Sequence, residues 1–215
     1  MVWTDREPSM ERLFPIYVKL RGRRVLVVGG GNVAEGKISG LLDTGAEIRV
    51  VALAASPRVQ EWATAGLLAL EERGFQSRDL EGVFLVVVAT RAEPLGEQVF
   101  REAQARGILA NVVDVPGQCD FFYPAVVRRG DLQIAISTSG QSPSLAQRLR
   151  QQLERQLGEG YAAWVAELGE TRRQVLGSNL SPEQKRFLLQ SLASREAFEA
   201  MASTKGKERP QGEGK

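Results

Sequence analysis

The run of three glycines at residues 29–31 constrains this chain more than any other feature of its sequence. It follows the apolar run Val25–Val28, which is typical of a buried strand. It precedes Val33–Asp43, where the spacing of apolar residues predicts a helix. The residues from Gly29 to Ala34 match the pattern G-x-G-x-x-G/A in the position where a βαβ unit requires it.

Each glycine-turn position has a physical role in binding a dinucleotide. Gly29 allows the tight turn, Gly31 lets the backbone approach a pyrophosphate, and Ala34 lets the helix pack closely on the strand. The free N–H groups at the helix N-terminus favour the phosphates. We therefore predict a nicotinamide-dinucleotide site on residues 25–37. A glycine-rich turn without a ligand is the alternative.

The same residues resemble a second phosphate-binding pattern. Gly31–Lys37 reads G-x-x-x-x-G-K, as in a P-loop, but Ile38 follows where a magnesium-binding hydroxyl is required. Ser39 comes one position too late for that role. We therefore expect no hydrolysis of nucleoside triphosphates.

Strands and helices alternate along the first half of the chain. Strands are predicted at Ile16–Leu20, Arg24–Val28, Glu47–Ala52, Leu67–Glu71, Gly82–Thr90 and Ile108–Asp114. Helices are predicted at Val33–Asp43, from Pro57 to Ala65, and at Pro94–Arg106. This alternation predicts an α/β fold with a Rossmann-like, doubly wound parallel sheet.

After Pro116 the pattern changes, and we place the end of the first domain at residue 117. The apolar segment Phe121–Val127, a strand at Leu132–Thr138 and the loop Ser137–Ser144 follow. Helices are predicted at Leu145–Leu157, Tyr161–Leu176 and Pro182–Met201. The expected domains are residues 1–117, 118–150 and 151–202, with a charged, glycine-rich tail at 203–215 that we expect to be disordered.

The chain has no histidine and one cysteine, Cys119. This composition excludes histidine-based zinc sites, Ser-His-Asp triads, Cys-His pairs and internal disulfides. Acid–base chemistry must then use Asp, Glu, Lys, Tyr or Cys. We predict no bound metal and interpret Cys119 as a packing residue.

Charge and hydropathy limit the partners. The net charge of +2 gives no reason to expect a nucleic acid. The longest apolar stretch, Val83–Ala89, fits a buried strand and is too short to span a membrane. Residues 1–12 show no apolar core of a secretory signal. We expect a cytoplasmic protein without a membrane partner.

One feature of NAD-binding Rossmann units is missing. The second strand ends in Val50-Val51-Ala52-Leu53-Ala54, where an Asp or Glu usually binds the adenosine ribose. The ribose must then be held by backbone groups or by a residue from elsewhere. No acid repels a 2′-phosphate, so charge alone does not distinguish NAD from NADP, and Arg58 would favour NADP.

Four segments carry a resemblance to a known family. They are Pro15–Leu20 (PIYVKL), Gly29–Lys37 (GGGNVAEGK), Asn111–Pro116 (NVVDVP) and Ser137–Pro143 (STSGQSP), in this order. Together they resemble the precorrin-2 dehydrogenase/sirohydrochlorin ferrochelatase family, the front part of siroheme synthases, over residues 14–198. Gly36 departs from the family pattern, which has a bulkier residue there.

The resemblance implies a homodimer, in which residues 118–150 form the dimerisation and substrate-binding domain. It implies NAD-dependent oxidation of the tetrapyrrole precorrin-2 to sirohydrochlorin in siroheme biosynthesis. Some members also insert Fe²⁺ into sirohydrochlorin, which leaves a second, ferrochelatase (lyase) activity open. It places NAD contacts on Asn32, Val33, Leu53 and Ala54. With the glycine turn, the candidate cofactor-binding residues are Gly29, Gly31, Asn32, Val33, Ala34, Leu53, Ala54 and Thr90.

The family's catalytic aspartate corresponds to Asp114. The residue is the last of the fifth predicted strand, so its side chain is expected at the carboxyl edge of the sheet, near the nicotinamide end of the crevice. A carboxylate there can take a proton while hydride leaves the substrate. The alternative is a turn-forming aspartate before Pro116.

A second candidate site combines hydroxyl groups, a glycine and a helix N-terminus, which together can receive an anion. We predict that it binds the carboxylates of the tetrapyrrole, with Arg148 and Arg150 from the following helix as partners. The candidate substrate-binding residues are Ser137, Thr138, Ser139, Gly140, Ser142 and Arg148. An ordinary helix N-cap is the alternative, and both roles are compatible.

Two other functions stay open from the sequence. The glycine turn would also suit a non-catalytic NAD-sensing Rossmann module, or a dehydrogenase that acts on a different substrate. No basic recognition helix follows residue 116, which argues against a DNA-binding regulator.

Overall fold

The computed structural model describes residues 12–199. The chain forms two compact units, with the boundary between Tyr123 and Pro124, and each is described here by itself. The predicted tail at 203–215, and the end of the helix predicted at Pro182–Met201, lie outside the described residues.

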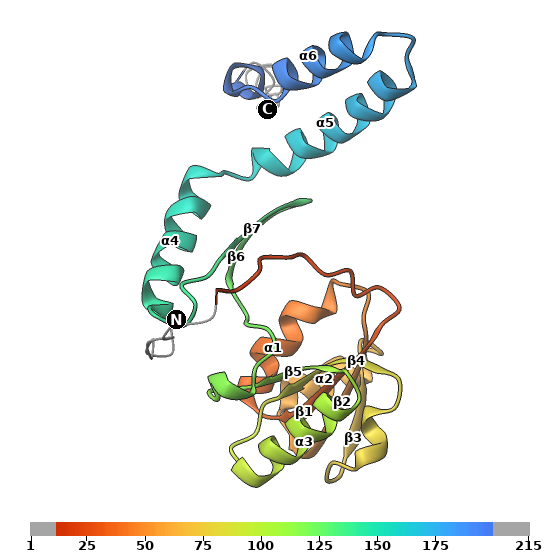
Figure 1. Cartoon of the computed structure of the whole chain (residues 1–215), viewed down its shortest axis with the longest axis vertical. Helices are drawn as coiled ribbons and strands as arrows, with labels where there is room; N and C mark the ends of the chain where they lie inside the picture. Colours follow the sequence, from red (N-terminus) through yellow and green to blue (C-terminus); the bar gives the residue numbers. More distant parts are fainter. Residues whose placement is uncertain (1–11, 200–215) are drawn as a thin grey trace, which may run out of the picture. The chain divides into compact units, whose positions relative to one another are not determined.

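The first unit is built on a five-stranded parallel sheet with the strand order β3-β2-β1-β4-β5 (Figure 1). The strands are β1 (Arg24–Gly30), β2 (Glu47–Ala55), β3 (Ala69–Glu72), β4 (Val83–Val88) and β5 (Leu109–Val112). The strand order reverses between β1 and β4, which makes this pair the topological switch point. The predicted doubly wound parallel sheet is confirmed.

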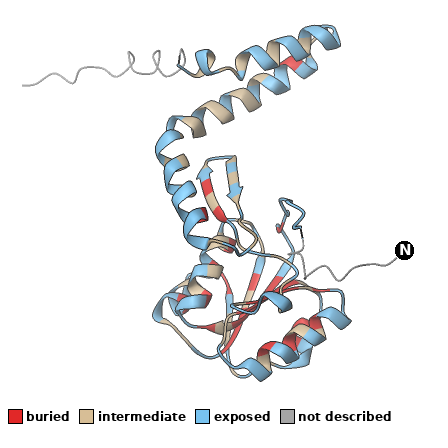
Figure 2. Ribbon diagram, turned by 60° about the vertical axis from the view of Figure 1, so that its left-hand side comes forward, coloured by how far each residue is buried: buried red, intermediate tan, exposed pale blue. Residues whose placement is uncertain are grey.

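Alternating side chains of β1 divide the core into two layers. Val25 and Val27 pack on one face of the sheet with Ile38 of α1 (Asn32–Leu42) and Val59 of α2 (Pro57–Thr64). Leu26 packs on the other face with Val99 of α3 (Glu93–Ala105). Successive side chains of a strand point to opposite faces, so a strand covered by helices on both sides must be apolar throughout (Figure 2).

The second unit begins with an antiparallel hairpin of β6 (Ala125–Arg129) and β7 (Leu132–Ile136). Three helices follow, α4 (Pro143–Gln156), α5 (Gly160–Gly177) and α6 (Pro182–Leu192). Arg129 joins hairpin to helix, because its guanidinium donates to the carbonyls of Glu154 (2.9 Å) and Leu157 (2.7 Å) at the end of α4. These bonds satisfy carbonyl groups that a helix C-terminus leaves without partners.

Two predicted elements differ from the structure. The strand predicted at Ile16–Leu20 does not form, and residues 12–20 have no regular secondary structure. In this segment only Leu20 is buried. The segment finds no place beside β1, because β2 and β4 already pair with the two sides of that strand. The last predicted helix is interrupted, since α6 ends at Leu192 and Ser194 starts a new helical turn by accepting a bond from the Ala197 N–H (3.2 Å).

Candidate functional site

The turn between β1 and α1 depends on Gly29. Its backbone has a φ of +114°, which side-chain-bearing residues rarely adopt. A Cβ atom there would lie 2.4 Å from the carbonyl oxygen of Ala89, directly after β4. The structure thus supports the tight-turn role predicted for Gly29.

Gly30 has a role that the sequence analysis did not assign. A Cβ atom on Gly30 would lie 2.9 Å from the carbonyl oxygen of Ala54 and 3.0 Å from the Cα of Ala55. The Gly30 carbonyl also accepts a hydrogen bond from the Ser56 N–H (2.8 Å). The turn is therefore packed against the end of β2. A glycine at the variable middle position of the G-x-G pattern was the only sign of this contact in the sequence.

Gly31 stands in open space. A Cβ atom on this residue would meet no atom within 4 Å. Gly31 is the N-cap of α1 and makes no side-chain capping bond, so the N–H groups of the first turn are available to an anion. Ala34 is fully buried against the sheet, while Asn32 and Val33 are exposed. The protein's own packing does not require a glycine at position 31, but a ligand at the helix N-terminus would.

The other candidate cofactor-binding residues lie at the same edge of the sheet. Leu53 and Ala54, in the last part of β2, are exposed, with 84% of Leu53 accessible. Thr90 follows β4, and its hydroxyl accepts a bond from the Ala92 N–H (3.3 Å). Because β2 and β4 both pair with β1, their carboxyl ends flank the glycine turn. All eight candidates therefore belong to one region.

Asp114 follows β5 at this edge. The strand was predicted to reach Asp114 but ends at Val112, because Asp114 has a φ of +64° and cannot continue an extended strand. The Val113 N–H donates to the Val88 carbonyl (3.0 Å), which holds the segment beside β4. Asp114 itself is exposed. An aspartate tolerates the left-handed conformation better than most residues. The two predicted roles of Asp114, in the turn and as a base, are therefore compatible.

Two residues near Asp114 were not identified as site residues from the sequence. Lys37 of α1 is half-buried, with its Nζ 4.1 Å from the ring centroid of Tyr123. Burial lowers the pKa of Lys37, while the negative charge of Asp114 acts in the opposite direction. The Tyr123 hydroxyl is buried and has no hydrogen-bond partner among residues 12–199. No local pattern could reveal this pair, since the two residues are distant in sequence.

Cys119 and Asn111 hold the loop that carries Asp114. The Cys119 thiol lies within hydrogen-bonding distance of the carbonyls of Val112 (3.2 Å) and Val115 (3.3 Å). The buried Asn111 amide donates to the Cys119 sulfur (3.3 Å) and to the Phe121 carbonyl (2.8 Å). Burial raises the pKa of Cys119, which disfavours the reactive thiolate.

The candidate substrate-binding residues belong to the second unit. Ser142 caps α4 by accepting a bond from the Leu145 N–H (3.2 Å), and the Thr138 hydroxyl accepts one from the Ser142 N–H (3.0 Å). Ser139 and Gly140 both have positive φ angles, +50° and +81°. The N-cap alternative therefore describes Ser142 correctly, without excluding a bound anion.

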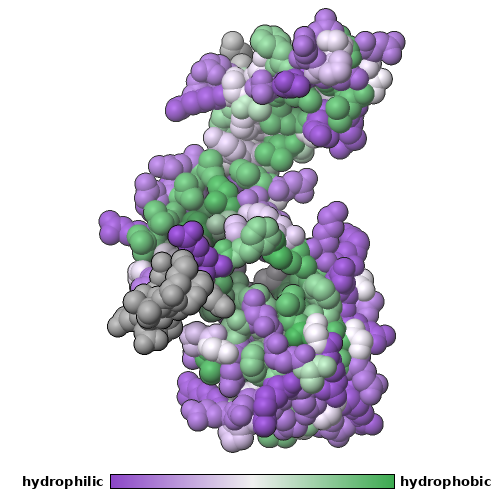
Figure 3. Space-filling model, viewed as in Figure 1, coloured by the Kyte–Doolittle hydropathy of each residue, from purple (hydrophilic) through white to green (hydrophobic). Residues whose placement is uncertain are grey.

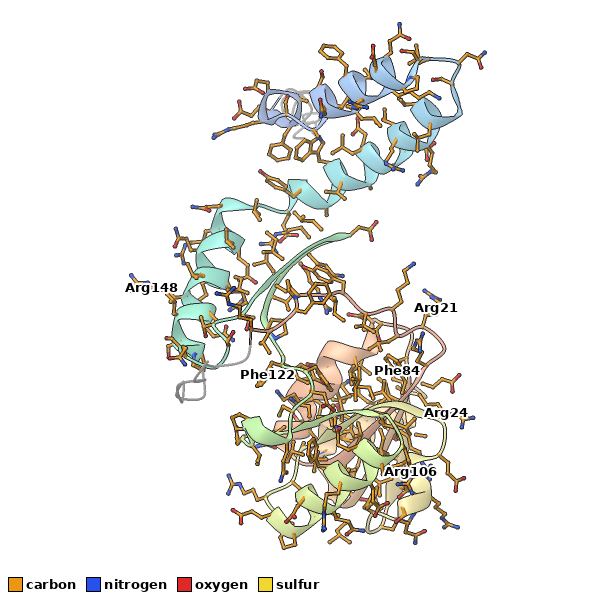
Figure 4. The ribbon with its side chains drawn as sticks, viewed as in Figure 1. Arg21, Arg24, Phe84, Arg106, Phe122 and Arg148 are labelled. Carbon is orange, nitrogen blue, oxygen red and sulfur yellow. The ribbon has the colours of Figure 1, made fainter. Side chains whose placement is uncertain are left out.

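The two arginines predicted with this loop differ in their surroundings. Arg148 extends outward from α4 (Figure 4), whereas the neighbouring Arg150 pairs with Glu154. Within the described residues, no group of three or more Cys, Asp or Glu side chains is placed to hold a metal ion. No helix in that same part of the chain is long and apolar enough to cross a membrane.

Comparisons with known proteins agree with this geometry. Residues 16–125 match the family described as "Putative NAD(P)-binding", and residues 129–156 match the family "Sirohaem biosynthesis protein central". The chain is 41% identical over 174 residues to "Siroheme synthase 1" of Serratia proteamaculans, which covers 80% of this chain and 37% of that protein. It is 44% identical over 162 residues to the siroheme synthase of Ectopseudomonas mendocina, covering 75% and 34%.

A solved structure extends the comparison to nearly a whole protein. The precorrin-2 dehydrogenase SirC has a TM-score of 0.74 and 33% sequence identity, covering 86% of this chain and 92% of that chain. By contrast, the chain spans little more than a third of the length of the siroheme synthases that it matches.

Proposed function

This chain belongs to the precorrin-2 dehydrogenase family of siroheme biosynthesis, and we propose that it oxidises precorrin-2 to sirohydrochlorin with NAD. The likeness to SirC over nearly the whole of both chains carries this proposal. The glycine turn supports it independently, because Gly31 leaves the N-terminus of α1 open to a pyrophosphate.

Residues at the carboxyl edge of the sheet would hold the cofactor. We assign the pyrophosphate to the N–H groups of Asn32 and Val33, and the adenosine to the exposed backbone at Leu53 and Ala54. We place Thr90 and the turn at Gly29 at the floor of the site. When bound, the cofactor supplies a hydride acceptor.

Asp114 is the proposed catalytic base. Oxidation of precorrin-2 removes a hydride and a proton, and an exposed carboxylate at the carboxyl edge of the sheet can accept the proton. Lys37 places a positive charge in the same cluster, and burial in contact with the Tyr123 ring holds it there.

The substrate would be held by charge as well as by shape. Precorrin-2 carries acetate and propionate arms, and we assign their recognition to the loop of Ser137, Thr138, Ser139, Gly140 and Ser142 together with Arg148. The support is the exposed cation of Arg148 on α4 and the helix N-terminus capped by Ser142.

We also propose a cytoplasmic homodimer. We keep residues 1–117 as the dinucleotide-binding domain, 118–150 as the dimerisation and substrate-binding domain, and 151–202 as the helical domain. A two-stranded hairpin such as β6–β7 is at most marginally stable alone and presents unpaired edges. Leu145 and Leu149 are exposed one turn apart on α4, and Figure 3 shows apolar side chains on the viewed face of this region.

The assay is anaerobic mixing of the protein, NAD and precorrin-2, followed by absorbance of NADH and of the tetrapyrrole. We expect turnover with matched appearance of both products. Cofactor binding without turnover would favour the non-catalytic NAD-sensing module, and turnover only with other substrates would favour a different dehydrogenase.

Fe²⁺ insertion is a separate proposal about the same site. The tetrapyrrole supplies nitrogen ligands, so the protein needs only a base such as Asp114 for the pyrrole protons. We expect slow Fe²⁺ or Co²⁺ insertion into sirohydrochlorin under anaerobic conditions. A rate equal to the protein-free control would leave the dehydrogenase as the one activity of this site.

A further inference from the structure

The end of β2 lacks the group that excludes NADP from a Rossmann site. An acid there binds the ribose hydroxyls of NAD and repels a 2′-phosphate. Residues 48–60 contain no acid, and the exposed Leu53 occupies the end of the strand. The acids that flank this segment are Glu47 and Glu61, and Glu72 of β3 pairs in register with Ala52 and accepts a hydrogen bond from Gln60 (3.4 Å). The end of β2 itself therefore carries no acid.

The glycine turn and the start of α2 are in direct contact. Ser56, the N-cap of α2, donates its N–H to the Gly30 carbonyl (2.8 Å), and a Cβ atom on Gly30 would touch Ala55 at 3.0 Å. A ribose bound between the glycine turn and the end of β2 would thus lie beside the first turn of α2. Arg58 is the second residue of that helix.

Arg58 is a cation held in place without an acidic partner. Its Cζ lies 5.3 Å from the ring centroid of Trp62, one helical turn later. Trp62 is half-buried and packs against the core, so it provides a fixed platform. Within residues 12–199, Arg58 makes no ion pair. A guanidinium with free donors is suited to bidentate contact with a phosphate.

We propose that Arg58 forms a subsite for the 2′-phosphate of NADP, so that this chain binds NADP about as well as NAD. The inference rests on the dinucleotide site of the proposed function and adds to it a specificity-determining residue. The observations that carry it are the acid-free end of β2, the Ser56–Gly30 bond, and the position of Arg58 in the first turn of α2, without an ion pair among residues 12–199.

Calorimetric titration of the full chain with NAD and with NADP tests this directly. We expect the Kd for NADP to be less than tenfold that for NAD, and to rise more steeply with salt, because an exposed phosphate–guanidinium pair is screened. A Kd for NADP more than tenfold above that for NAD would overturn the proposal. Binding of NAD alone contradicts only this inference, whereas binding of neither cofactor also contradicts the dinucleotide site.

Two variants make the assignment specific. Arg58→Ala should raise the ratio of the NADP and NAD dissociation constants by about three- to tenfold, the range expected for an exposed charge-assisted contact. Arg101→Ala is the matched control, because Arg101 is an exposed arginine on α3, at the opposite face of the sheet. We expect it to leave the ratio unchanged. An unchanged ratio in Arg58→Ala would show that Arg58 does not form the subsite.

Discussion

The Nζ of Lys37 lies 4.1 Å from the ring centroid of Tyr123, and this contact packs α1 against the last residue of the first unit. A cation above an aromatic ring is attracted by about 0.5–2 kcal/mol, with the larger values for desolvated pairs. The hydroxyl of the same residue is buried without a hydrogen-bond partner in the described part of the chain. The ring is therefore favourable at this position and the hydroxyl is not.

Replacing Tyr123 by phenylalanine should stabilise the protein. The change keeps the ring under Lys37 and removes a buried polar group, whose lack of a partner costs about 1–3 kcal/mol. We expect the free energy of unfolding to rise by roughly 1 kcal/mol in denaturant titrations. Tyr123→Leu, which loses the ring as well, is the comparison and should be less stable than Tyr123→Phe. A loss of stability in Tyr123→Phe would show that the hydroxyl has a partner, such as a water molecule.

The stability should also depend on alkaline pH through Tyr123. Burial raises the pKa of Tyr123 from 10.0 to about 12, so the folded protein holds the phenol proton more tightly than the unfolded chain does. This contribution is complete below pH 10 and is lost as the pH rises towards 12. We expect the stability advantage of Tyr123→Phe over the natural protein to grow across this interval. An advantage that stays constant with pH would contradict the burial of the phenol.

Substitutions of Gly29 and Gly31 should affect different properties of the protein, stability at Gly29 and NAD binding at Gly31. Gly29→Ala places a Cβ 2.4 Å from the Ala89 oxygen at a φ of +114°, and should lower the free energy of unfolding by about 2–4 kcal/mol. A Cβ atom at Gly31 meets no protein atom within 4 Å, so we expect Gly31→Val to fold but to lose measurable NAD binding through a clash with the pyrophosphate. Thermal unfolding and calorimetry distinguish the two. Undiminished NAD affinity in Gly31→Val would place the cofactor elsewhere.

Asp114→Asn should remove catalysis and leave the fold intact. Asparagine tolerates the φ of +64° but cannot accept the proton, so we expect turnover to fall by about 10²–10⁴-fold with little change in NAD affinity. Steady-state rates with precorrin-2 and calorimetry with NAD are the measurements. A loss of less than about tenfold would identify Asp114 as a turn residue without a role as base.

Arg148→Ala should weaken substrate binding more than catalysis. Arg148 is exposed, so its attraction to a carboxylate is screened over about 8–10 Å at moderate salt. We expect KM for precorrin-2 to increase with ionic strength in the natural protein, and to be higher but less salt-dependent in the variant. Arg172→Ala, an exposed arginine on α5, serves as the control. Equal salt dependence in Arg148→Ala and the natural protein would remove Arg148 from the site.

The sequence alone determined the elements whose signal is local. The apolar runs of β1 and β4 and the glycine turn between β1 and α1 predict a doubly wound sheet with a dinucleotide site at its carboxyl edge. Burial on both faces requires such runs, and a positive φ at Gly29 requires a glycine. The place of Asp114 at the carboxyl edge was accessible to the same reasoning, because it lies at the end of the fifth apolar run, and the family resemblance added its catalytic role.

Tertiary structure decided what depends on contacts between distant residues. Ile16–Leu20 has the composition of a strand, but both edges of β1 are occupied and no strand forms there. Gly30 is required by the approach of β2, and Lys37 acquires its environment from Tyr123 and Asp114, which reach it only through folding. A residue's strand pairing, burial and electrostatic environment depend on its neighbours in space. Those neighbours are often distant in sequence, so local sequence patterns do not reveal them.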